Sequence, residues 1–311
     1  MENVVFVPAV ACGEWLGDVL PGCSPAELPV AGRRLIDYEI DAAKRFGTVL
    51  AEVLDWRYSE TLFAEYSDIM RTGCALFYVR GDGQPPRGLN DLKGYPSPLT
   101  QNPPDNLVVV WGACLPCHEL GSSTLAPVPD EECGSTPPGI YRLVSGRWMR
   151  VSPHGIVISD VRSWHAANMS LLDDPGLFTL PGYSAEKDVH LGRNVVMEYG
   201  VDAKSPVLLQ DNSWCARNVR LDGEVIVGCR SYVGEGARLS RTVVCDDTFV
   251  GAGLDLQDKI VAGGRIIDAE TGAWIDVSDG GVARSIHEKP WLGWLSSLWG
   301  LLKGRSTGRR R

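Results

Sequence analysis

From residue 189 onward, small or apolar residues recur at every sixth position of the chain. A second set stands four positions after each of these guide positions, from Val195 to Phe249. The apolar stripe of an α-helix repeats about every 3.6 residues, whereas a period of six is typical of a parallel β-helix. We therefore predict a β-helix of ten unbroken hexads, whose guide residues are Leu191, Met197, Ala203, Leu209, Cys215, Leu221, Val227, Val233, Leu239 and Cys245.

The part of the chain before these repeats shows shorter apolar runs with strand and helix patterns. The runs predict buried strands at residues 3–10, 76–79, 107–111 and 156–159. Apolar residues near the helical period predict helices over residues 34–46 and about 163–172. This order of strand, loop and helix indicates an α/β domain. Two segments rich in Gly and Pro, residues 81–104 and 127–138, predict surface loops.

A third pattern occupies the end of the chain. After Pro290, apolar residues recur at the spacing of an amphipathic helix that is too short to span a bilayer. Tryptophan and leucine on one face, followed by basic residues, fit a helix lying in the membrane interface. The residues expected to bind the membrane are Trp291, Trp294, Leu295, Leu298, Trp299, Leu302, Lys303, Arg305, Arg309, Arg310 and Arg311. Docking of this helix on the protein itself or on a partner is the alternative.

Charge and cysteine content refine this division into three parts. The chain of 311 residues has a net charge of −9, yet residues 284–311 hold seven basic residues and one acidic residue. The body is expected to repel nucleic acid, and the tail to attract polyanions. Nine cysteines, an odd number, and no leader-like N-terminus favour reduced thiols in the cytoplasm. We predict parts at 1–182, 183–283 and 284–311 in a cytoplasmic protein peripheral to the inner face of the plasma membrane.

Three segments of the first part carry motifs that can be compared with a known family. Residues 28–38 read Leu-Pro-Val-Ala-Gly-Arg-Arg-Leu-Ile-Asp-Tyr, residues 106–113 end an apolar run with Gly-Ala, and residues 158–168 include Ile-Ser-Asp-Val-Arg. These segments resemble the sugar nucleotidyltransferase-like family of bacterial nucleotide-sugar pyrophosphorylases, in which a hexapeptide-repeat β-helix follows, as in residues 187–262 here. The resemblance implies an α/β, Rossmann-like domain, a left-handed parallel β-helix and a homo-oligomer.

The chemistry of this family is only partly represented in the sequence. Nucleotidyl transfer needs donors around a triphosphate, a basic residue and Mg²⁺ held by carboxylates. The matching first loop, residues 9–16, keeps Gly13; a family lysine aligns near residues 25–26; the first metal-binding Asp aligns with Ala113. Asp160 alone remains of the metal pair, and it also suits a helix N-cap. We expect a catalytically degenerate domain without a cofactor, in which Gly13 and Asp160 are remnants of a site that would use Mg²⁺ if active.

Two further patterns indicate other chemistry. Cys114, Cys117 and His118 have the spacing of a haem-attachment motif, and with Cys133 they offer ligands for zinc, but we expect reduced loop thiols. His190 stands at the first coil and is the candidate general base for acyl transfer, a reaction that many similar β-helix proteins perform.

The sequence as a whole predicts a non-catalytic or weakly active scaffold or regulator in bacterial surface-polysaccharide or glycolipid biosynthesis. Its expected partners are an anionic membrane surface and a membrane sugar-phosphate transferase or another polysaccharide-assembly protein. The alternatives are an active sugar-1-phosphate nucleotidyltransferase and a hexapeptide-repeat acyltransferase.

Overall fold

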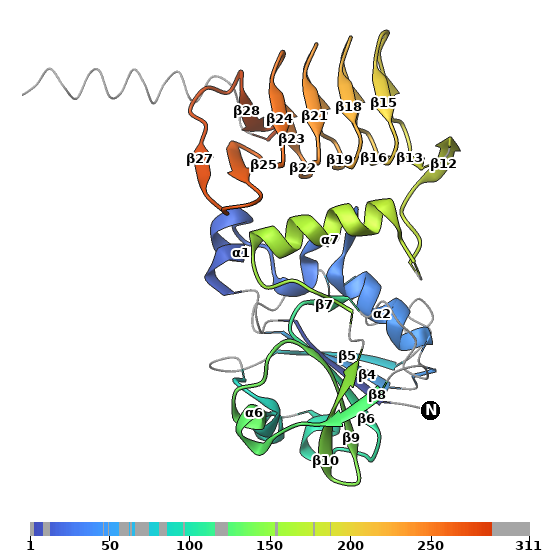
Figure 1. Ribbon diagram of the computed structural model, residues 1–311, viewed down its shortest axis with the longest axis vertical. Coiled ribbons are helices and arrows are strands. Elements are labelled where there is room, and N and C mark those ends of the chain that lie inside the picture. The colour runs from blue at the N-terminus through green and yellow to red at the C-terminus, as the bar shows by residue number, and fades with distance from the viewer. Residues whose placement is uncertain are drawn as a thin grey trace, which may run out of the picture. The chain divides into compact units, whose positions relative to one another are not determined.

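The computed structural model forms two compact units (Figure 1). The first comprises the residues up to Pro181 together with Ala269–Gly272, and the second comprises the rest of the chain from Gly182 onward. The residues that the structure describes are 3–8, 13–45, 47–48, 50–55, 62, 64–65, 75–80, 86–95, 97–115, 124–152, 155–176, 178–186 and 188–287.

The first unit is built on a seven-stranded mixed sheet, which confirms the α/β prediction. Four parallel strands lie in the order β5-β4-β1-β6, and three antiparallel strands, β9, β10 and β8, extend the sheet beyond β6. The bounds are β1 (Asn3–Val7), β4 (Leu50–Asp55), β5 (Ala75–Arg80), β6 (Leu107–Trp111), β8 (Thr124–Pro127), β9 (Gly139–Val144) and β10 (Arg147–Ser152). Two short pairs complete the strands: β2 (Pro29–Val30) with β3 (Arg33–Arg34), and β7 (Cys114–Leu115) with β11 (Ile156–Val157).

Apolar residues on both faces of the central strand β1 are fully buried. Val4 and Phe6 pack with Ile36 and Ile40 of α2, whereas Val5 and Val7 pack with Leu89, Leu92 and Leu99 on the other face. A parallel strand covered on both faces needs a continuous apolar run, which explains the sequence of residues 3–7. The helices are α1 (Gly13–Val19), η1 (Pro25–Glu27), α2 (Leu35–Arg45), η2 (Leu89–Gly94), α5 (Pro98–Gln101), α6 (Asp130–Gly134) and α7 (Val161–Asp173).

The two segments predicted as surface loops contain short helices, so that prediction is wrong in part. Leucines of η2 and α5 are buried against the sheet. The buried carboxylate of Glu52 in β4 accepts hydrogen bonds from the Ser97 hydroxyl and, at 3.2 Å, from the Leu99 N–H. Burial raises the pKa of Glu52. Ser97 and Pro98 start α5, so the Gly- and Pro-rich composition marks helix boundaries here as well as loops.

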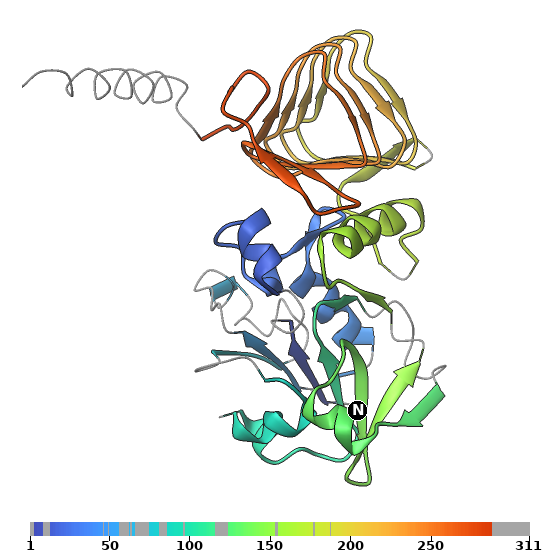
Figure 2. The same ribbon diagram turned by 60° about the vertical axis from the view of Figure 1, so that its left-hand side comes forward.

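The second unit is a parallel β-solenoid of about four turns, as the pairing of β13, β16, β19, β22 and β25 shows. Figure 2 shows its coils as closed loops with three flat sides, each side being one sheet. The strands are β13 (Val189–Leu191), β14 (Val196–Met197), β15 (Asp202–Lys204), β16 (Val207–Leu209), β17 (Trp214–Cys215), β18 (Arg220–Asp222), β19 (Val225–Val227), β20 (Tyr232–Val233), β21 (Arg238–Ser240), β22 (Thr242–Val244), β23 (Thr248–Val250), β24 (Asp255–Gln257) and β25 (Lys259–Ala262).

The prediction of ten unbroken hexads is wrong at its end. Val207 pairs with Val225, which is three full hexads later in the chain. Val225 pairs with Thr242, which is one residue short of three hexads. The corner after Leu239 is one residue shorter than the corresponding corner one turn earlier. Val244, and not Cys245, therefore lies in the core, which continues through Val250, Leu256 and Val261. Phe249, predicted to face inward, stacks on Tyr232 with ring centroids 5.3 Å apart.

Short antiparallel strands lie at both ends of the solenoid. At the first coil, β12 (Tyr183–Glu186) pairs with β13. At the last coil, β26 (Arg265–Asp268) and β27 (Trp274–Asp276) extend the sheet of β25, while β28 (Ala283–Ser285) pairs with β23. These strands cap both ends of the sheet that contains β13 and one end of the sheet that contains β23, which protects those coil edges from pairing with another chain.

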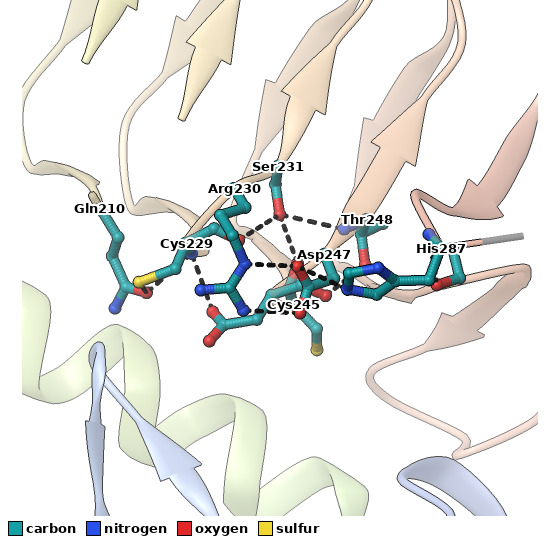
Figure 3. A network of polar contacts seen from close by, with 10 residues as sticks. Gln210, Cys229, Arg230, Ser231, Cys245, Asp247, Thr248 and His287 are labelled. Atoms are coloured by element: carbon teal, nitrogen blue, oxygen red, sulfur yellow. Dashed lines mark hydrogen bonds and ion pairs between the residues drawn. The ribbon is translucent and has the colours of Figure 1, made fainter. Parts of the chain in front are cut away.

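Polar side chains connect successive coils at one corner of the solenoid (Figure 3). Arg230 has a positive φ of 54°, and its guanidinium donates to both carboxylate oxygens of Asp247 at 2.6 and 2.7 Å. Asp247 also contacts His287 Nε2 at 3.2 Å, which fixes the last described residue to this corner. The Ser231 hydroxyl donates to the Cys245 carbonyl and accepts from the Thr248 N–H, so buried backbone groups at the turn are satisfied.

We predict that Gly228→Ala destabilises the solenoid by about 1–3 kcal/mol. A Cβ at this position would lie 2.6 Å from the backbone nitrogen of Asp246 in the next coil. Gly236→Asn is the matched control, because nothing lies within 4 Å of a Cβ there, and Asn218 already adopts a positive φ of 57° at the equivalent corner. Chemical denaturation of both variants measures the difference, and equal stability would contradict the packing at Gly228.

Candidate functional site

The strand order of the first unit identifies one edge of the sheet as a binding edge. β4 and β5 lie on one side of β1 and β6 lies on the other, so the chain reverses its winding between β1 and β6. Ligands of open α/β sheets bind outside the carboxyl ends of the strands at such a switch point. Val7 pairs with Trp111 there, and the Gly112 N–H donates to the Val7 carbonyl at 3.0 Å with a φ of 82° at Gly112.

The glycine of the predicted first loop, Gly13, comes after β1 in the chain. Gly13 begins α1, the first helix after β1, so its place in the chain agrees with a loop that follows the first strand. Residues 9–12 of the predicted loop lie outside the described residues.

Two positions where the resemblance requires charge hold buried small or apolar residues. Ala113 follows Gly112, is fully buried, and its carbonyl accepts from the Ile158 N–H at 2.8 Å. Pro25 and Ala26 lie buried in η1, and Ala26 belongs to the core cluster of Val4. A charged side chain at either position would therefore be buried without a partner, and this burial would cost several kcal/mol of folding free energy.

Asp160 is the N-cap of α7, as expected from its place before the helix. Its carboxylate accepts from the Ser163 N–H and from the Ser163 hydroxyl, both at 2.7 Å. The Ser163 hydroxyl also accepts from the Asp160 N–H at 2.9 Å, which completes a capping box. Hydrogen bonds from Ser163 lower the pKa of Asp160. The carboxylate is thus ionised and exposed, but one of its oxygens is committed to the helix terminus.

Asn168 is a structural residue of this unit that the sequence did not single out. Its side-chain oxygen accepts from the Ala31 N–H at 2.8 Å, while its amide nitrogen donates to the Trp164 carbonyl. Trp164 in turn donates from Nε1 to the Pro29 carbonyl at 2.6 Å. These contacts join α7 to the segment around Pro29. Both regions belong to the three segments that resemble the family. An amide on the apolar face of a predicted helix was the available signal.

The chemical groups expected for metal binding do not converge in the described part of the chain. No group of three His, Cys, Asp or Glu residues with metal-binding geometry occurs there. Cys114 is buried in β7 and Cys133 is buried in α6, while Cys117 and His118 of the haem and zinc patterns lie outside the described residues. At the described switch-point edge, the residues do not fit a Mg²⁺ site, because Asp160 is the single carboxylate that the resemblance leaves.

The structure places His190 on the first coil, in β13, where it pairs with Ser184 of β12. Its Nδ1 is buried without a hydrogen-bond partner. Within residues 188–262 successive coils pair strand by strand and have nearly equal lengths, so no extended loop approaches His190 from the solenoid.

The cysteine in the corner network is not poised as a nucleophile. The Cys229 Sγ donates to Gln210 Oε1 at 3.3 Å, and burial raises the pKa of Cys229 to about 11 (Figure 3). A thiol with this pKa stays protonated at neutral pH, and the thiolate is the reactive form. The thiol of Cys229 therefore connects coils and is not a ready nucleophile.

A comparison with curated proteins finds a partial match to this chain. Over 115 residues, the chain is 27% identical to a UTP–glucose-1-phosphate uridylyltransferase of Synechocystis sp.. The match includes 37% of this chain and 29% of the relative, so the chain spans less than a third of that protein's length. No protein-family model matches. The chain is a weak, partial homologue of a sugar nucleotidyltransferase, and this distant likeness agrees with the mixed α/β sheet and the solenoid.

The residues beyond His287 lie outside the described part of the chain, including the predicted tail helix and all of its membrane-binding residues. Among the described helices, none is long and apolar enough to cross a membrane.

We predict that Asp160→Ala lowers the free energy of unfolding by about 1 kcal/mol at pH 7, because α7 loses its cap. Asp160→Asn should remain close to the wild type, since Asn caps helices as well as Asp does. The pKa of Asp160 is lowered in the folded state, so its ionised carboxylate stabilises the fold above its ordinary pKa of 3.8, and this contribution is lost as the pH falls through the lowered value. Denaturation between pH 7 and pH 2 should show the Ala deficit shrinking at acid pH; a constant deficit would contradict the ionic cap.

Proposed function

We propose that this protein is a non-catalytic or weakly active nucleotidyltransferase-like scaffold or regulator. The observation that supports the proposal is the chemistry of the switch-point edge. Ala113 is buried directly after the turn that follows β6, residues 25–26 are buried in η1, and Asp160 caps α7. Stabilising a triphosphate and its developing charge needs preorganised cations and donors, and the positions where the family resemblance expects a lysine and the first carboxylate hold Pro25, Ala26 and Ala113.

An active sugar-1-phosphate nucleotidyltransferase is the second candidate, and the partial likeness to a uridylyltransferase favours it. In that case Mg²⁺ would supply charge neutralisation, with Gly13 and Asp160 as the remaining site residues. The described edge argues against this candidate because it requires the carboxylate of Asp160 to serve both as cap and as ligand.

Incubation of the purified protein with each nucleoside triphosphate, sugar 1-phosphates and Mg²⁺ distinguishes the two candidates. We predict no pyrophosphate release above the background without enzyme. Release that persists in the wild type and disappears in Asp160→Asn would overturn the proposal, since Asn keeps the helix cap and removes the charge. Loss in Asp160→Ala alone would instead report the weakened helix.

The proposed setting is surface-polysaccharide or glycolipid biosynthesis at the cytoplasmic face of a bacterial plasma membrane. The support is the likeness to a sugar nucleotidyltransferase together with the Trp- and Arg-rich tail of the sequence. A membrane sugar-phosphate transferase or another assembly protein is the proposed partner, and the solenoid is the proposed site of self-association.

We predict that the full-length protein binds anionic vesicles and that added salt weakens the binding, because exposed charges are screened over a Debye length of about 8 Å at physiological ionic strength. Trp294→Glu should abolish binding while the two units remain folded. Ile275→Glu is the control, since this residue is 63% exposed in β27, outside the tail. Indifference of the wild type to anionic vesicles at low salt would contradict the peripheral-membrane proposal.

A further inference from the structure

One side of the solenoid presents apolar side chains to solvent in a continuous row. Val196, Trp214, Tyr232 and Phe249 occupy equivalent outward positions on β14, β17, β20 and β23, and we name this row the aromatic strip. Trp214 and Tyr232 have ring centroids 6.4 Å apart, and Tyr232 and Phe249 are stacked at 5.3 Å. Val196 remains 37% exposed and Trp214 41%.

The strip deepens into a hollow at its end nearest the last coil. The hollow has a volume of about 590 Å³, and Tyr232, Phe249 and Ile286 contribute apolar surface to it. Arg284 covers one face of Phe249 at 4.7 Å, so the rings present mainly their edges to the hollow. A row of ring edges beside an apolar hollow suits the side chains of a helix, because aromatic edges pack favourably against other aromatic faces.

The described chain ends at the border of this hollow. Ile286 lines the hollow and is 43% exposed, and His287, held by Asp247, is the last described residue. Three residues separate His287 from Trp291, which is a reach of roughly 10 Å in an extended chain. The predicted helical segment 291–302 can therefore start beside the hollow without a long linker.

The predicted helical segment 291–302 and the aromatic strip have similar lengths. Twelve residues of α-helix measure about 18 Å, and four strands of a solenoid side, spaced about 4.8 Å apart, extend over about 14 Å. The apolar face of the segment, with Trp291, Trp294, Leu298 and Leu302, is thus long enough to cover the whole strip.

Charged residues beside the strip do not set the direction of the helix. Glu235 and Arg284 both line the hollow. At the far end of the strip, Glu198 already pairs with Arg217 at 3.6 Å and accepts a hydrogen bond from Trp214 Nε1 at 3.1 Å. The match between tail and strip therefore rests on the apolar face of the tail, its length and the short connection from His287.

We propose that the aromatic strip is an intramolecular docking surface for residues 291–302 of the same chain. The inference uses the amphipathic tail of the proposed function and adds the site that the tail occupies away from a membrane. The same Trp and Leu face cannot be buried in the strip and in lipid at once. Membrane binding therefore requires release of the tail. The apparent membrane affinity is the intrinsic affinity multiplied by the fraction of chains whose tail is undocked.

Hydrogen exchange of the full-length protein, followed by mass spectrometry, tests this docking. Without vesicles, amides of residues 291–302 should exchange at least about tenfold more slowly than in an unstructured chain. The double substitution Trp214→Thr with Tyr232→Thr should remove that protection, because it deletes the aromatic surface and keeps residues that favour strands. Ile275→Thr, an exposed position outside the strip, should leave the protection intact. Trp294→Glu should remove protection from the tail side.

Two outcomes would overturn the proposal. One is a tail that exchanges at the unprotected rate in the wild type, and the other is protection that survives in the double variant with an unchanged melting temperature. Protection that rises with protein concentration would assign the strip to a second copy of the chain, which also overturns it. Vesicle binding distinguishes this result from the proposed function: if docking occurs, the double variant should bind anionic vesicles more tightly than the wild type, whereas a protein that never binds vesicles refutes the membrane proposal alone.

Discussion

The parallel pairing of β1 with β6 is the interaction on which the first unit depends. β1 is buried on both faces, and its neighbours β4 and β6 satisfy its backbone on both edges. This pairing also creates the switch point, because the chain continues from β1 to one side and returns with β6 on the other. The same constraint that stabilises the sheet therefore determines where a ligand would bind. The sheet can therefore fold without the residues that bind a ligand, because the strands need apolar residues and the ligand needs charged ones.

In this protein the turn after β6 is formed by residues without charge. Gly112 with its positive φ still turns the chain after β6, but the next residue, Ala113, is packed in the core. Asp160 caps α7 through its hydrogen bonds with Ser163, and a helix of 13 residues begins there. This structural role alone is enough to require Asp160 or a similar capping residue at this position.

Many of the strands, the cap of α7 and the solenoid could be predicted from the sequence, because strong periodicities are local properties of the chain. The strand of residues 107–111 and the cap at Asp160 followed from apolar runs and capping chemistry. The shortened corner after Leu239 could not, since Val243, Val244 and Cys245 are all apolar or small and any of them fits the pattern. Only the pairing of Thr242 with Val225 resolves the register. The sequence could indicate that the Asn168 amide needs a buried partner, but it could not identify that partner, because Ala31 lies 137 residues away.

We propose that the switch-point edge does not bind a nucleoside triphosphate. Isothermal titration of UTP with Mg²⁺ into the full-length protein tests this proposal most directly, because binding requires the charged groups even where turnover is slow. We expect no saturable heat and a Kd weaker than about 1 mM. Saturable binding in the micromolar range that disappears in Asp160→Asn, with the melting temperature unchanged, would contradict it.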